Sequence, residues 1–160
     1  MDVRTARHAL AALMILWAVP AFAQCATPPA DAELTLSRPA GGSIAREFGD
    51  TWDDLKGAKT FHPGLDFEAP AGEPVYAALP GRVGEVKHDG VLGHNVVIDH
   101  GAGVQTVYGH LQRASVSPGA CVKAGEQIGT AGSSGLVPGP RLYFELRRAG
   151  KPVDPAPLLQ

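Results

Sequence analysis

The chain has 160 residues, of which 44% are hydrophobic, and its formal net charge at pH 7 is -2. This length and composition fit one globular domain and exclude a disordered tail. The slightly acidic balance also argues against a nucleic-acid-binding protein, which would carry a basic surface.

The N-terminal segment has the pattern of a cleaved export signal over residues 1–23. Arg4 and Arg7 precede an apolar run over 9–19, and Pro20 is followed by the small-x-small sequence Ala-Phe-Ala. The apolar run is roughly half of the ~20 residues that a membrane-spanning helix needs, so the alternative of a retained anchor is not favoured. Cleavage predicts a periplasmic protein without stable membrane insertion, with full secretion as the alternative.

The only two cysteines of the chain are Cys25 and Cys121. In an oxidising compartment they could pair as a disulfide, and the alternative is one buried and one exposed thiol. Closing a loop of this length would stabilise the fold by up to about 4 to 5 kcal/mol in the chain-entropy model. Lipid attachment at Cys25 is not favoured, because the sequence before it lacks the Leu and the small residue of a lipid-modification signal.

After the signal, a short leader over 24–35 is rich in Pro, Ala and acidic residues and is predicted to be flexible. The folded domain is expected over 36–157, where short alternating or β-branched runs are separated by Gly and Pro. These runs are SIAREFG, GLDFEAP, PVYAALPG, RVGEVKHDG, HNVVIDHG, VQTVYGHL, CVKAGEQIGTAG and RLYFELRR. Strands of about 5 to 7 residues at this regular spacing predict an all-β antiparallel sandwich or barrel with minimal helix.

The stretch over 49–61, GDTWDDLKGAKTF, is polar around the lone Trp52 and is predicted to be a loop. A solvated connector is the simple interpretation. A binding role is the alternative, because long loops beside a site often carry binding residues.

The first candidate for chemistry is the sequence His62-Pro63-Gly64-Leu65-Asp66. Pro63 and Gly64 exclude a helix, and on an extended chain His62 and Asp66 share one face. Gly64 between them would leave room for something to approach. An imidazole nitrogen and a carboxylate oxygen are ordinary zinc ligands.

The second candidate is His110, at the end of the run VQTVYGHL. A histidine near a carboxylate could act as a general base or donate a hydrogen bond to a transition state, although a structural role is the alternative. Three further histidines, His88, His94 and His100, lie in Gly-rich turns or next to Asp99. We expect them to be solvated or bonded to the backbone.

The third candidate is the run GPRLYFEL over 139–146, whose alternation predicts a strand. Period 2 places Arg141 and Tyr143 on one face and Leu142 and Phe144 on the other.

Together, four segments resemble the core of the lysostaphin and LytM type of zinc endopeptidase, in the right order and spacing. They are FHPGLDFEAPAGEPVYAALPGRV, NVVIDHGAGVQTVYGHL, VSPGACVKAGEQIGTAGSSG and GPRLYFEL, and the match runs from about Leu36 to Pro155. The resemblance implies a LytM-like β fold of the duplicated hybrid motif type. It also implies that His62 and Asp66 match the first two zinc ligands, in an HxxxD motif, and that His110 matches a catalytic histidine.

The chain departs from this family at the HxH motif, which is usually within GPHLHFE and is here Arg141-Leu142-Tyr143. A catalytic zinc needs about three protein ligands and one open position. Tyr143 stands at the third ligand, and a phenol with a reference pKa of about 10 must lose its proton to bind a metal well. Arg141 has no lone pair to offer, and its charge at roughly 5 Å from a divalent ion would cost about 6 to 7 kcal/mol at an effective dielectric of ~20.

The departure fits a groove that works without a metal. Arg141 could neutralise Asp66 through a two-pronged pair in place of the metal. The alternatives are simple drift, with Arg141 and Tyr143 solvated on an edge strand, and an altered zinc site. We therefore expect a degenerate site with no cofactor, with bound zinc as the alternative.

Together with this departure, the resemblance implies a non-catalytic LytM-like factor in peptidoglycan remodelling, which binds peptidoglycan or activates a cell-wall amidase. Its groove would be lined by Arg141, Tyr143 and Tyr108. The alternative is a zinc metalloendopeptidase that cleaves peptide cross-links of peptidoglycan with help from His110. A biotinyl or lipoyl carrier is disfavoured, because export separates Lys123 from the cytoplasmic ligating enzymes.

Overall fold

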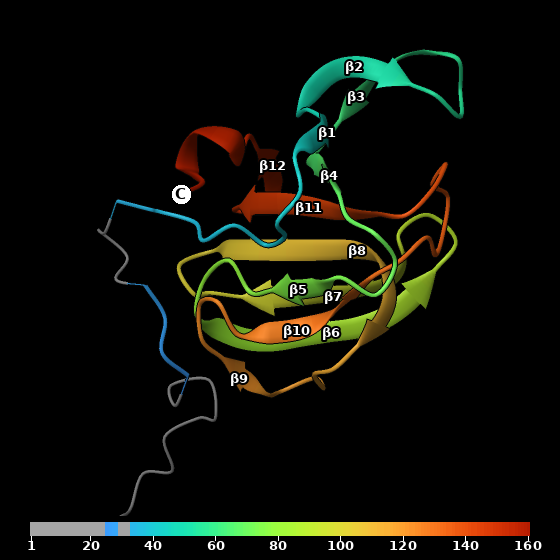
Figure 1. Cartoon of the computed structure of the whole chain (residues 1–160). Coiled ribbons are helices and arrows are strands. Elements are labelled where there is room, and N and C mark those ends of the chain that lie inside the picture. Colours follow the sequence, from blue (N-terminus) through green and yellow to red (C-terminus); the bar gives the residue numbers. More distant parts are fainter. Residues whose placement is uncertain (1–24, 29–32) are drawn as a thin grey trace, which may run out of the picture.

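The computed structural model describes residues 25–28 and 33–160 (Figure 1). The predicted export signal over 1–23 lies outside the described residues, as does part of the leader over 24–35. The strands, in chain order, are β1 (Ile44–Arg46), β2 (Gly49–Asp53), β3 (Ala58–His62), β4 (Leu65–Glu68), β5 (Pro74–Tyr76), β6 (Gly81–Asp89), β7 (Gly93–Asp99), β8 (Val104–Ala114), β9 (Cys121–Val122), β10 (Gln127–Ala131), β11 (Arg141–Arg148) and β12 (Lys151–Val153), followed by a 3-10 turn, η2 (Ala156–Leu158). The predicted all-β antiparallel fold is confirmed, since the named strands pair antiparallel and η2 is the only helical element in the described part of the chain.

A 10-stranded sheet forms the body of the domain, in the order β1-β4-β11-β8-β7-β6-β9. Strand β12 pairs with β11, while β10 pairs with both β8 and β5. Because the long strand β8 bonds to β7, β11 and β10, the sheet folds over itself, and β5 and β10 form a second layer in front of β6 and β7 (Figure 1). Consecutive hairpins account for β6-β7-β8, whereas β4-β11 and β8-β11 join segments that are far apart in the sequence.

The hydrophobic core lies between these two layers. Leu142 and Phe144 of β11 are fully buried in it, as the alternation of that strand predicts. Tyr108 of β8 pairs with Phe144 and is equally buried, so the prediction that Tyr108 lines a groove is wrong. Its hydroxyl accepts a hydrogen bond from the Ala78 N–H at 2.8 Å and one from the Thr106 hydroxyl at 3.0 Å. Burial raises the pKa of Tyr108 to about 12.

The stretch over 49–61 is a β-hairpin, and the prediction of a loop is wrong. Strands β2 and β3 pair from Gly49 opposite His62 to Asp53 opposite Ala58. They form a separate two-stranded sheet that projects from the main body (Figure 1). This hairpin has no clear sequence pattern, because two strands that are mostly solvated carry no alternating apolar residues.

Side-chain contacts at the turn and at the base hold this hairpin. The Asp53 carboxylate accepts hydrogen bonds from the N–H groups of Leu55 and Lys56, at 3.1 and 3.2 Å, and so shapes the turn. The Arg46 guanidinium, on β1, donates to the Thr60 hydroxyl at 3.0 Å and lies 3.5 Å from Asp53 Oδ2. The hairpin is therefore fastened to the strand that precedes it.

Both ends of the described chain are attached to the sheet. Cys25 and Cys121 form a disulfide, and Cys121 lies in β9. The backbone of Leu36 bonds to Leu158 at 2.7 Å and to Gln160 at 2.9 Å. Within the described residues, no helix is both long and apolar enough to cross a membrane.

Candidate functional site

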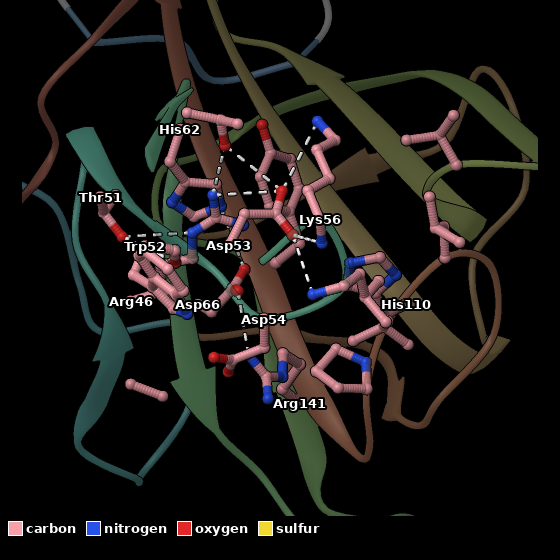
Figure 2. Close-up of a pocket in the computed structure, with 18 of the residues that line it drawn as sticks. Arg46, Thr51, Trp52, Asp53, Asp54, Lys56, His62, Asp66, His110 and Arg141 are labelled. Carbon is pink, nitrogen blue, oxygen red and sulfur yellow. Dashed lines mark hydrogen bonds and ion pairs between the residues drawn. The ribbon is translucent and has the colours of Figure 1, made fainter. Parts of the chain in front are cut away.

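A groove of about 410 Å³ lies between the β2–β3 hairpin and the main sheet (Figure 2). The site residues predicted from the sequence meet in it, apart from Tyr108 and the cysteines. They come from three regions of the chain: His62 at the end of β3 and Asp66 in β4, His110 in β8, and Arg141 and Tyr143 in β11.

His62 and Asp66 converge across a bend and do not share one extended strand. Pro63 and Gly64 separate β3 from β4, and the bend brings His62 Nε2 to 3.3 Å from Asp66 Oδ1. His62 Nδ1 lies 2.9 Å from the backbone carbonyl oxygen of Glu47. A carbonyl oxygen only accepts, so Nδ1 carries a proton and Nε2 is the nitrogen that faces the carboxylate.

Gly64 makes room for strand β11 instead of an incoming ligand. A Cβ on Gly64 would lie 2.4 Å from the Phe144 carbonyl oxygen and 3.0 Å from Tyr143 Cε2. The glycine therefore permits the bend between β3 and β4 to pack directly on the strand that carries the altered motif.

Arg141 contacts Asp66 directly. Its Nη1 donates to Asp66 Oδ2 at 3.2 Å, and the two side chains are only 20% and 7% exposed. The contact is a single hydrogen bond, not the expected two-pronged pair, since Arg141 Nε and Asp66 Oδ1 are buried without hydrogen bonds. Burial acts to raise the pKa of the Asp66 carboxyl, but His62 and Arg141 outweigh it and hold that pKa below its usual range.

The Tyr143 phenol is engaged with a buried carboxylate on its own strand. Its hydroxyl donates to Glu145 Oε2 at 2.7 Å, and Arg147 donates to the two oxygens of Glu145 at 2.7 and 3.1 Å. Burial, and then the charge of Glu145, raise the pKa of Tyr143 above its usual range. The phenol therefore keeps its proton, while its ring packs at 5.6 Å from that of His62 and 6.0 Å from that of His110.

His110 is held in an unusual backbone conformation, with a φ of 59°. Its N–H donates to the Leu92 carbonyl oxygen at 2.7 Å, and its Nδ1 lies 2.9 Å from the Ser134 carbonyl oxygen. Burial lowers the pKa of His110, although the contact with Ser134 opposes this. Since Nδ1 must donate to that carbonyl, Nε2 is the nitrogen that can accept a hydrogen bond.

These residues do not match the donor set of a catalytic zinc. His62 Nε2 and Asp66 Oδ1 would serve as two ligands, but the phenol at the third position stays protonated and donates its hydrogen bond to Glu145, and the Arg141 guanidinium contacts Asp66. Within residues 25–28 and 33–160, no group of three or more His, Cys, Asp or Glu side chains is placed to hold a metal ion. Among the described groove residues, the side chains at the family's three ligand positions therefore offer two of the about three ligands that a catalytic zinc needs.

Sequence reasoning missed the residues that support the site. Glu145 and Arg147 share a strand face with Arg141 and Tyr143, so the same period-2 rule could have identified them. Glu47 and Ser134 contribute only backbone carbonyl groups to the two histidines, and a backbone group leaves no signal in the sequence.

The other histidines of the described residues, His88, His94 and His100, do not line the groove. His100 is buried, with Nδ1 at 2.8 Å from the Pro80 carbonyl oxygen and Nε2 at 2.7 Å from the Thr106 hydroxyl. Its backbone contact is of the kind expected, and burial lowers its pKa. His88 and His94 are exposed.

Comparison with known proteins places this site in a family context. Over 112 residues the chain is 38% identical to the DD-carboxypeptidase/endopeptidase Mpg of Neisseria meningitidis, covering 70% of this chain and 26% of that protein. It is 43% identical over 98 residues to the murein hydrolase activator EnvC of Escherichia coli, covering 60% of this chain and 23% of that protein. The chain thus spans about a quarter of the length of these curated relatives.

The fold agrees with these sequence relationships. The catalytic domain of lysostaphin from Staphylococcus simulans superposes with a TM-score of 0.65 at 28% identity, covering 72% of this chain and 90% of that domain. The family model described as Peptidase family M23 matches residues 60–155, which include His62, Asp66, His110, Arg141 and Tyr143. The chain therefore belongs to peptidase family M23 and has the lysostaphin-type β fold.

Proposed function

We propose that this chain is a non-catalytic M23 domain of the bacterial envelope, which uses its groove to bind and activate a cell-wall hydrolase such as an amidase. The observation that carries the proposal is the pair formed by Arg141 and Asp66, at 3.2 Å, where the family pattern leads one to expect a metal. The relative EnvC, which is named as a murein hydrolase activator, supports this direction.

The apolar rim of the groove supports a binding role. Among the described residues, the exposed large apolar side chains line the groove with the single exception of Tyr76; they are Trp52, Leu55, Phe61, Val91 and Leu136. Exposed apolar side chains gathered at one concave surface mark an interaction site. This rim favours a protein segment with apolar side chains as the ligand over bare glycan, with peptidoglycan peptides as the second choice.

The proposed location is outside the cytoplasm. A disulfide between Cys25 and Cys121 and membership of a family with cell-wall relatives both indicate an extracytoplasmic protein. We further propose the periplasm, reached after cleavage of the signal over 1–23.

A zinc endopeptidase is the second candidate, and one observation favours it. His62 Nε2 and Asp66 Oδ1 face each other without a hydrogen bond, which is how two ligands of one cation would lie. The relative Mpg, which is named as a carboxypeptidase and endopeptidase, points the same way.

One experiment separates the two candidates. The chain is purified without chelator, its zinc content is measured, and it is incubated with muropeptides alone and with an envelope amidase. We expect less than one zinc per chain, no cleavage by the chain alone, and faster release of peptide by the amidase. One tightly held zinc together with cleavage of peptide cross-links would overturn the proposal in favour of the endopeptidase.

A rim variant tests whether the groove is the binding surface. Trp52→Ala removes a side chain that is 57% exposed on the hairpin, and we expect it to weaken amidase stimulation. Tyr76→Ala is the matched control, because it truncates an exposed aromatic residue that does not line the groove. Equal stimulation by both variants would place the partner on another surface.

A further inference from the structure

A pair of exposed histidines lies near the tip of the β6–β7 hairpin. His88 and His94 are direct cross-strand partners, next to the turn over 89–93. Their ring centroids are 4.5 Å apart with planes at 66°. Direct partners in an antiparallel pair project from the same face, with Cβ atoms about 5 Å apart. Two imidazoles at this spacing can turn their nitrogens toward one point.

Hydrogen bonds to Asp89 hold the tip of the hairpin, and they do not involve either histidine ring. Asp89 Oδ1 accepts from the N–H groups of Val91 and Leu92, at 3.0 and 2.8 Å, and Asp89 Oδ2 accepts from Asn95 Nδ2 at 2.8 Å. Neither imidazole of the pair makes a hydrogen bond within the described residues. The bracing fixes the backbone of both strands, so little conformational entropy would be lost when the rings are bridged.

Lys87 is the nearest basic side chain along β6, and it does not repel a cation bound between His88 and His94. Lys87 precedes His88, so it projects from the opposite face of β6, where its ammonium contacts Glu85 Oε2 at 2.7 Å. The region around the rings therefore differs from the groove, where the Arg141 guanidinium lies on the carboxylate.

We propose that His88 and His94 form a two-imidazole site for a divalent first-row metal ion, with water completing the coordination. Imidazole nitrogen suits copper, nickel and zinc, whereas calcium and magnesium prefer oxygen ligands. The Irving–Williams order places Cu²⁺ first. This site is separate from the groove and does not rest on the proposed function.

A bound ion would also stiffen one wall of the groove. The turn between the two histidines carries Val91 and Leu92, which line the groove, and the Leu92 carbonyl oxygen accepts the His110 N–H at 2.7 Å. An ion that bridges β6 and β7 next to this turn would slow the local opening of the turn. The two strands could then separate only if a bond between the metal and a histidine broke.

The test uses the full chain, purified without a histidine tag and titrated with Cu²⁺ by calorimetry and electron paramagnetic resonance. We expect one site with two nitrogen ligands and tighter binding of Cu²⁺ than of Zn²⁺. His88→Ala and His94→Ala should each lower the affinity about 100-fold, because the second contact of a chelate acts at high effective concentration. Lys87→Ala and His62→Ala are the controls and should leave the affinity unchanged.

Hydrogen exchange supplies a second readout. The amides of Val91 and Leu92 should exchange more slowly with Cu²⁺ in the parent chain and at an unchanged rate in His88→Ala. Copper binding that survives the combined His88→Ala and His94→Ala variant belongs to other donors and overturns the proposal. So does binding that is lost in His62→Ala, since the ion would then lie in the groove.

Discussion

At the scale of single residues, one ion pair and one hydrogen bond determine the chemistry of the groove. The Arg141 guanidinium contacts Asp66, and the Tyr143 phenol gives its hydrogen bond to Glu145. Removing either member of a largely buried charge pair leaves the other uncompensated, so Arg141 and Asp66 depend on each other. A zinc ion would have to displace the guanidinium and find a third ligand.

The first residue-scale prediction concerns recovery of a metal site. Arg141→His together with Tyr143→His removes the cation and places an imidazole where the phenol now stands. Glu145 would then accept a hydrogen bond from that imidazole and orient it, as carboxylates next to metal ligands do. We expect the double variant to bind one zinc per chain with micromolar or tighter affinity, measured by competition with a chromogenic chelator.

Arg141→His alone is the control for this prediction. It relieves the charge repulsion, but the third position keeps a phenol whose pKa lies above its usual range. We expect zinc affinity to stay close to that of the parent chain. If the double variant behaves like this single variant, the backbone geometry of the groove does not support three ligands.

At the scale of secondary-structure elements, strand β11 carries both the core and the site. Leu142 and Phe144 fill the core, while Arg141, Tyr143 and Glu145 face the other way. Period 2 thus lets one eight-residue strand position the groove residues on a rigid, buried support. The bend at Gly64 packs on this strand and sets its distance from β4.

The element-scale prediction tests that contact. Gly64→Ala would place a Cβ 2.4 Å from the Phe144 carbonyl oxygen, so β4 and β11 must separate. We expect a loss of about 1 to 3 kcal/mol in the free energy of unfolding, as is typical of overpacking. Thermal unfolding followed by circular dichroism measures it. Gly139→Ala is the matched control, because nothing lies within 4 Å of its Cβ position, and it should unfold at the parent temperature.

At the scale of the whole molecule, the site depends on pairings between distant segments. Tyr143 of β11 pairs with Asp66 on one side and with Gly109, next to His110, on the other. The disulfide between Cys25 and Cys121 spans 96 residues and ties the N-terminal side of the chain to β9. It therefore closes a loop that contains most of the sheet.

The whole-molecule prediction concerns this disulfide. Cys121→Ser removes the cross-link, and we expect the free energy of unfolding to fall by about 2 to 5 kcal/mol. Urea unfolding of the parent chain and the variant, each with and without a reductant, measures the change. Reductant should bring the parent chain to the stability of the variant and leave the variant unchanged. Equal stability of the oxidised parent chain and the variant would show that the cross-link contributes nothing.

The sequence alone determined most strands of the main sheet and the identity of five groove residues. Alternation is a local property, so it predicted the all-β fold and assigned Arg141 and Tyr143 to one face of β11. The family pattern then grouped them with His62, Asp66 and His110, and the structure brings these five residues together in one groove.

Only the tertiary structure decided how these residues are used. The register of β8 against β11 placed Tyr108 in the core. The hairpin over 49–61, where a loop was expected, has a turn that is held by hydrogen bonds to the Asp53 carboxylate. The single bond from Arg141 to Asp66 depends on the tertiary approach of two strands about 75 positions apart in the chain. The contacts that decide whether a metal can bind arise from pairings between remote segments, and no local pattern in a sequence records those.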